Sequence, residues 1–117
     1  MRRVEKPWGH ELIWAETPRY IAKILHIEAG HKLSRQYHRV KDETLFVESG
    51  VMDLELGDAS SLETRTMQKG DVFHVTPGTI HRMIAVETTR VFEVSTTELD
   101  DVVRLSDDYG REGTSKA

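Results

Sequence analysis

The chain has 117 residues, which is the length of one domain with one core, and 38% of them are hydrophobic. Its net charge of −4 at pH 7 argues against a general attraction to nucleic acid or to an anionic membrane. Cysteine is absent, so disulfides and thiolate metal sites are excluded, and any metal must be held by His, Glu, Asp or Gln.

Targeting signals are not evident in the sequence. No apolar stretch approaches the roughly 20 residues that a membrane-spanning helix requires. The N-terminal residues lack the apolar core of a signal peptide. We therefore expect a cytoplasmic protein.

The N-terminal part of the chain alternates apolar runs with turn residues. Pro7 and Gly9 interrupt the first segment, which ends in a short extended piece at residues 12–14. Residues 19–27 are predicted to form a strand, and its two faces are both largely apolar. Such a strand is typical of a structure in which two sheets pack together.

Short strands are expected to follow at nearly regular intervals. They cover residues 33–38, 43–49, 52–56, 62–67, 72–75, 81–86 and 90–96. The tight link at Gly50-Val51 predicts that the second and third of these pair as a hairpin. Residues 99–105 fit either a strand or a helical turn, and residues 112–117 are predicted to be a frayed tail. Strands that recur at roughly 8–12 residues predict an all-β, single-domain jelly-roll barrel over residues 1–111.

Side chains that can bind a metal cluster between Gly30 and Gly50. In an extended strand, Gln36 and His38 point to the same face. Glu43 opens the next apolar run, so the chain can turn back and bring its carboxylate beside them. Nitrogen and oxygen donors of this kind suit zinc, manganese, iron, cobalt or nickel, so the donors alone do not name the metal.

A further donor is expected from a second motif. His81 follows the Pro77-Gly78 turn at the end of a short apolar strand, from where its side chain can point back into a barrel. Taken singly, each of these polar residues is explained by hydrogen bonding inside a barrel. Together, Gln36, His38, Glu43 and His81 predict a site for a divalent metal.

The two motifs resemble those of the cupin family. The matching residues are Gly30, Gln36, His38, Glu43 and Gly50 in the first motif and Gly70, Gly78 and His81 in the second. Gln36 replaces the first histidine of the family, and the resulting set resembles the zinc site of phosphomannose isomerases. The flanking segments Lys6-Pro7-Trp8-Gly9 and Asp107-Asp108-Tyr109-Gly110-Arg111 resemble the opening and closing of the type II phosphomannose isomerase cupin domain. This resemblance implies zinc as the favoured metal and an aldose–ketose isomerase acting on mannose 6-phosphate or a similar sugar phosphate.

The resemblance also suggests which residues act on a sugar phosphate. Lys41 stands where the related domains tend to carry an arginine, and Arg82 matches their His-Arg pattern, so both are candidates to meet the phosphate. Lys41, His74 or a water at the metal are the candidates for the base.

Two other functions remain alternatives. One is a non-catalytic metal- or sugar-binding module, because cupins host many functions. The other is a metal-dependent oxygenase, which Gln36 disfavours because an amide is a weaker donor than imidazole. The expected partners are a small-molecule sugar phosphate and a second copy of the chain. We expect a homodimer, with the segment from Trp8 to Trp14 near its interface, because the strands are apolar on both faces.

Overall fold

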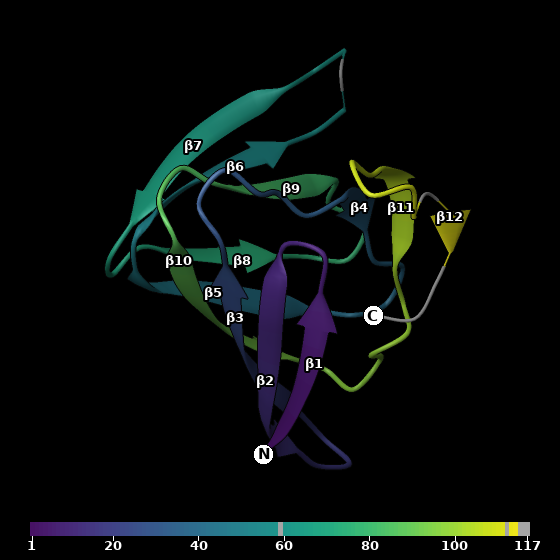
Figure 1. Cartoon of the computed structure of the whole chain (residues 1–117). Helices are drawn as coiled ribbons and strands as arrows, with labels where there is room; N and C mark the ends of the chain where they lie inside the picture. The colour runs from purple at the N-terminus through teal and green to yellow at the C-terminus, as the bar shows by residue number, and fades with distance from the viewer. Residues whose placement is uncertain (59, 112, 115–117) are drawn as a thin grey trace.

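The computed structural model describes residues 1–58, 60–111 and 113–114, which contain twelve strands (Figure 1). The strands are β1 Arg2–Lys6, β2 Gly9–Glu16, β3 Ile21–Ile27, β4 Arg35–Tyr37, β5 Glu43–Ser49, β6 Val51–Leu56, β7 Glu63–Gln68, β8 Val72–Val75, β9 His81–Ala85, β10 Thr89–Ser95, β11 Val103–Ser106 and β12 Gly113–Thr114. Among these residues no helix is long and apolar enough to cross a membrane.

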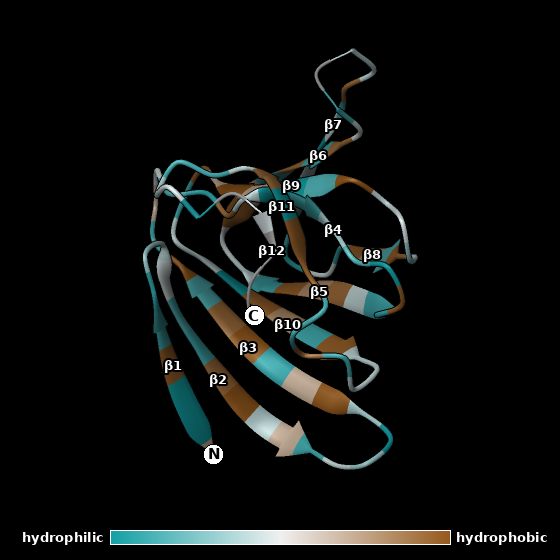
Figure 2. Cartoon of the chain, turned by 90° about the vertical axis from the view of Figure 1, so that its right-hand side faces the viewer, coloured by the Kyte–Doolittle hydropathy of each residue, from teal (hydrophilic) through white to brown (hydrophobic). Residues whose placement is uncertain are grey.

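The strands form two six-stranded sheets. One sheet has the order β1-β2-β3-β10-β5-β8 and the other the order β12-β11-β4-β9-β6-β7, with every neighbouring pair antiparallel. Side chains alternate between the faces of each strand, so the inward-facing apolar residues of both sheets meet in one core. That core includes Leu25, Ile27, Leu45, Val47, Met52, Leu54, Val75 and Val91. Figure 2 shows hydrophobic residues (brown) interspersed with hydrophilic ones along strands such as β2 and β3. The predicted all-β jelly-roll architecture is confirmed.

The predicted hairpin between residues 43–49 and 52–56 is wrong. β5 pairs with β10 and β8, whereas β6 pairs with β7 and β9 in the other sheet. The chain changes sheets at Gly50, which has a φ of 87°, and a Cβ there would lie 2.2 Å from the carbonyl oxygen of Thr88. The glycine is therefore required at a corner of the barrel, where two sheets approach each other closely.

Both ends of the chain are more regular than the sequence indicates. β1 and β2 form a hairpin in which Lys6 is paired with Gly9. β11 resolves the alternative at residues 99–105 in favour of a strand, which begins at Val103 and pairs with β4. The predicted frayed tail contains β12, which pairs with β11. The rest of that tail, residues 112 and 115–117, lies outside the described residues.

Candidate metal centre and pocket

Three of the predicted metal ligands meet at the ends of their strands. His38 follows β4, while Glu43 and His81 are the first residues of β5 and β9. One ligand atom from each lies within 4.8 Å of the others, and all three residues are buried. The two motifs meet because β4 and β9 are neighbours in one sheet, and Glu43 approaches from the facing sheet.

Backbone carbonyl groups set the hydrogen-bonding state of both imidazoles. Nδ1 of His38 lies 2.6 Å from the carbonyl oxygen of Asp101, and Nδ1 of His81 lies 2.9 Å from that of Thr79. A carbonyl oxygen can only accept, so each Nδ1 must donate its hydrogen. In a neutral imidazole, Nε2 then carries the lone pair that a metal needs.

The two Nε2 atoms face the same carboxylate oxygen. Oε1 of Glu43 lies 3.1 Å from Nε2 of His38 and 3.4 Å from Nε2 of His81. Neutral imidazoles and a carboxylate at these positions are all electron-pair donors, so all three could bind a cation placed between them. Nε2 of His81 and Oε2 of Glu43 are also buried without a hydrogen-bond partner among the described residues. The donor set therefore fits a divalent metal.

Gln36 is half-buried and lines the same pocket as His38 and Glu43. It is paired in register with His81, but its Oε1 accepts a hydrogen bond from Oγ of Ser34 at 2.5 Å. The structure thus brings Gln36 to the pocket and engages its amide oxygen with a buried serine, a contact that sequence spacing did not indicate.

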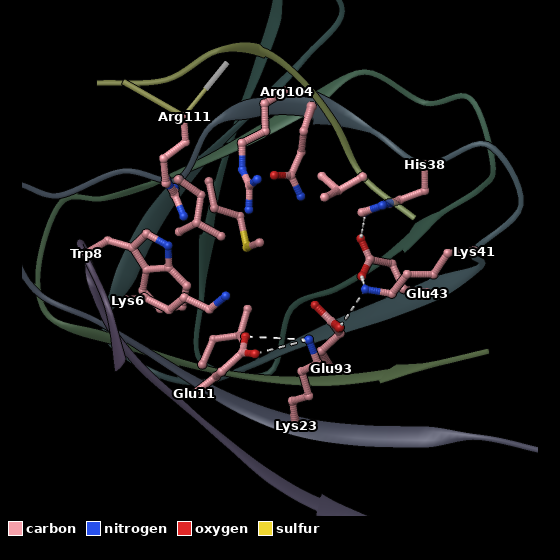
Figure 3. A pocket seen from close by; sticks show the side chains of 15 residues that line it. Lys6, Trp8, Glu11, Lys23, His38, Lys41, Glu43, Glu93, Arg104 and Arg111 are labelled. Atoms are coloured by element: carbon pink, nitrogen blue, oxygen red, sulfur yellow. Dashed lines mark hydrogen bonds and ion pairs between the residues drawn. The ribbon is translucent and has the colours of Figure 1, made fainter. Parts of the chain in front are cut away.

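Lys41 is buried between two carboxylates. Its Nζ lies 3.3 Å from Oε2 of Glu93 and 3.4 Å from Oε2 of Glu43 (Figure 3). Burial opposes the charge of Lys41, but Glu93 and Glu43 outweigh burial and raise its pKa above the usual range. Lys41 is therefore held as a cation and cannot act as a base.

The two carboxylates respond differently to this environment. Burial raises the pKa of Glu93, and the charge of Glu43 raises it further. For Glu43, burial is outweighed by the charge of Lys41, and its pKa is well below the usual range. Glu43 therefore remains ionised. Glu11 and Lys23 form a second buried pair beside them, at 3.4 Å.

The other two predicted site residues do not line this pocket. His74 has an exposed side chain on β8 and pairs with Asp42 at 2.6 Å. Arg82 follows His81 on β9 and points to the opposite side, where it donates to the carbonyl oxygen of Leu33 and pairs with Asp108 at 2.7 Å. Successive residues of a strand face opposite ways, which is why Arg82 cannot accompany His81.

The empty space of the pocket, with the open solvent at its mouth included, is about 490 Å³. Its lining residues are Lys6, Trp8, Glu11, Lys23, Leu25, Leu33, Gln36, His38, Lys41, Glu43, Met83, Glu93, Val102, Arg104 and Arg111. Sequence reasoning did not place Lys6, Trp8, Arg104 or Arg111 here. The sequence did contain a signal for three of them, because Lys6, Trp8 and Arg111 belong to the two flanking motifs.

Comparisons with known proteins agree with the fold. The sequence model of the cupin domain matches residues 23–95. A curated relative, xanthan biosynthesis protein XanB of Xanthomonas campestris pv. campestris, is 30% identical over 94% of this chain. The chain spans about a quarter, 24%, of the length of that relative.

Solved structures share the same architecture. KdgF from a Halomonas species superposes with a TM-score of 0.72 at 23% identity, covering 83% of this chain and 88% of its own. The capsular polysaccharide assembling protein CapF of Staphylococcus aureus gives 0.69 at 16% identity, covering 95% of this chain and 32% of its own. At these identities the likeness shows the fold alone.

Proposed function

The chain belongs to the cupin family, and we propose that it is a metal-dependent aldose–ketose isomerase of a sugar phosphate. The observation that carries the proposal is the meeting of His38, Glu43 and His81 at a pocket that also holds buried acidic and basic side chains. The relative XanB is named as a xanthan biosynthesis protein, which supports a carbohydrate ligand.

A divalent metal held by His38, Glu43 and His81 would supply Lewis-acid stabilisation where charge develops on the sugar oxygens. The remaining task falls to the protein. One group must take a proton from a carbon of the sugar and return it to the neighbouring carbon, while the hydroxyl proton of the sugar passes from one of the two oxygens to the other. His74 lies outside the pocket and Lys41 is held protonated, so neither suits this role.

Two pocket carboxylates remain for the proton transfer once Glu43 is assigned to the metal. Glu11 is bound by Lys23 in the floor of the pocket. Glu93 shares Lys41 with Glu43, so it stands next to the metal donors. We assign the proton transfer to Glu93, which accepts the carbon-bound proton and returns it to the adjacent carbon. Lys41 keeps the two neighbouring carboxylates from repelling each other.

Turnover of mannose 6-phosphate to fructose 6-phosphate tests the function. The protein is stripped of metal and reloaded with zinc, manganese, iron(II), cobalt or nickel in turn. We expect turnover with at least one metal and its loss after chelation. Glu93→Gln should lower kcat by roughly 10²–10⁴, the contribution of a positioned acid–base group. Glu87→Gln, at an exposed position, is the matched control.

Two results would contradict the proposed function, and a third would contradict only the role of Glu93. Binding of the sugar phosphate without turnover for every metal would identify a binding module. Oxygen uptake with a reduced metal would identify an oxygenase. Full activity in Glu93→Gln would leave the isomerase possible and remove Glu93 from the reaction.

A further inference from the structure

Three cations converge at the end of the pocket away from the metal donors. Lys6 is the last residue of β1, Arg104 lies on β11, and Arg111 follows the turn after β11. Their side chains extend into the pocket on the side of Trp8, whereas His38, Lys41 and Glu43 stand on the other side (Figure 3).

The carboxylates of the pocket do not balance this group of cations. Five cationic side chains line the pocket against three glutamates. Lys23 forms an ion pair with Glu11, and Lys41 forms ion pairs with both Glu43 and Glu93. At the Trp8 end, Arg111 pairs with Asp107, which does not itself line the pocket, and Lys6 and Arg104 are the other cationic side chains there.

Lys6 is the pocket cation whose side chain lacks a partner in the described part of the chain. Among the described residues its ammonium group makes no hydrogen bond and no ion pair, although Lys6 is half-buried. Burial lowers the pKa of Lys6, and nearby Lys23, Arg104 and Arg111 lower it further, against the charge of Glu11. Burial and the neighbouring Arg111 likewise lower the pKa of Arg104. Like charges held together in a pocket are stabilised by an anion that enters between them.

Arg111 is fixed in place before any ligand binds. Its guanidinium binds the buried carboxylate of Asp107 through two contacts of 3.0 Å and lies 5.8 Å from the ring centroid of Tyr109. Its own amide donates to Asp107 at 2.7 Å. Little side-chain entropy is then lost when Arg111 contacts a ligand.

We propose that Lys6, Arg104 and Arg111 form a subsite for a phosphomonoester. A phosphomonoester dianion has three terminal oxygens and a geometry that arginine recognises through paired hydrogen bonds. The sugar would then span the pocket, with its phosphate among these cations and its reacting carbons at the metal donors. The orientation rests on the proposed function, whereas the phosphate subsite does not. The proposed subsite takes the place of Lys41 and Arg82, which the sequence had suggested as the phosphate contacts.

Binding to metal-free protein tests the subsite separately from turnover. Titration calorimetry of the chelator-treated full chain would use inorganic phosphate, mannose 6-phosphate and mannose. Lys6→Gln should raise the dissociation constant for both phosphates roughly ten- to a hundredfold, as expected for one charge-assisted contact. Lys6→Arg should restore most of the affinity. Lys69→Gln, an exposed lysine in a turn, should change nothing.

Lys6 is the informative position because it has no partner to lose, so the thermal midpoint of Lys6→Gln should match that of the native protein. Arg111→Gln should give the same loss of phosphate affinity, and added salt should weaken binding of both phosphates and not of mannose. Undetectable phosphate binding by the native chain would overturn the subsite. Unchanged affinity in both Lys6→Gln and Arg111→Gln would do so as well, even if the isomerase activity were found. If Lys6→Gln and Arg111→Gln lower the phosphate affinity but the native chain shows no turnover, the subsite is supported and the isomerase is rejected.

Discussion

The imidazole of His38 donates from Nδ1 to the backbone carbonyl of Asp101 at 2.6 Å, across a sequence separation of 63 residues. The carboxylate of Asp101 in turn accepts the backbone amides of residues 39, 40 and 41 at 3.1, 2.7 and 2.9 Å. One aspartate thus orients the imidazole of the candidate metal centre and holds the loop that leads from His38 to Glu43. Partners of this kind tune metal affinity although they do not touch the metal.

Asp101→Asn should therefore weaken metal binding and stability together. We expect metal affinity to fall about tenfold, the lower end of the effect of such supporting groups. Asp100→Asn alters an exposed neighbour and should have no effect. Competition with a chromogenic chelator measures the affinity. Equal affinities in the two variants would show that the loop is positioned by other contacts.

The stability of the Asp101 contacts should depend on pH in a defined direction. Burial raises the pKa of Asp101, but the amides of Lys41, Val40 and Arg39 outweigh burial, and the pKa is lower than usual. The Asp101 carboxylate then makes its full contribution to the free energy of unfolding above about pH 3.9, the pKa of aspartate in the unfolded chain. That contribution is lost as pH falls through the lower pKa of Asp101 in the folded chain. In thermal unfolding of the metal-free protein, the difference in midpoint between the native and Asp101→Asn chains should be constant near neutral pH. It should shrink only in acid.

Metal content should depend on the histidines of the site. His38→Ala or His81→Ala should reduce the metal bound per chain to well below one, because each removes a buried donor. Gln36→Ala should cause a smaller loss, since an amide oxygen is the weaker donor. His10→Ala, at a position stacked on His26 away from the site, is the control. Elemental analysis measures the content, and native binding should weaken as pH falls toward about 6. Full occupancy in either histidine variant would exclude this centre.

The buried ion pairs of Lys41 should make its removal costly. Lys41→Met leaves the carboxylates of Glu43 and Glu93 without their shared cation, and breaking such a buried pair costs about 3–5 kcal/mol of the free energy of unfolding. The double variant Lys41→Met/Glu93→Gln should recover part of that loss, because only one buried carboxylate then remains. Urea denaturation at neutral pH compares the two. A single variant as stable as the native chain would mean that the carboxylates take up protons at little cost.

The homodimer expected from the sequence remains a prediction. An apolar row runs across the outer face of one sheet through Leu12, Ile24, Phe92, Phe46 and Val72, which are successive cross-strand partners. Phe46 and Val72 are 39% and 59% exposed, and exposed Trp14 continues β2, whereas Trp8 is buried in the pocket. A second copy of the same apolar face is the occupant that we expect.

Light scattering at micromolar concentrations tests the dimer. Phe46→Glu should convert a dimer to a monomer without loss of metal, because Phe46 points away from the pocket. Leu62→Glu places the same charge on an exposed leucine outside this row and should leave the dimer intact. A native chain that scatters as a monomer would contradict the prediction.

The sequence by itself determined the fold class and the meeting of His38, Glu43 and His81. Strand alternation and turn residues are local signals, so β5 and β8 have the bounds that the pattern predicts. The spacing of His38, Glu43 and His81 was sufficient because each stands at a strand end, where the register fixes its direction. Gly50 was recognised as a turn, but its link joins two sheets, and only the close approach of Thr88 reveals that.

The tertiary structure decided which charges share the pocket. The sequence made Lys41 a candidate to meet the phosphate, but Glu93, 52 residues later in the chain, pairs with it at 3.3 Å. Arg82 is adjacent to His81 in the chain, yet the alternation of the strand turns it toward Asp108. Lys6 and Arg111 belong to opposite ends of the sequence, and no local pattern brings them together. Charge pairing depends on distances in space, so it follows from the packing of the two sheets and not from neighbouring residues in the chain.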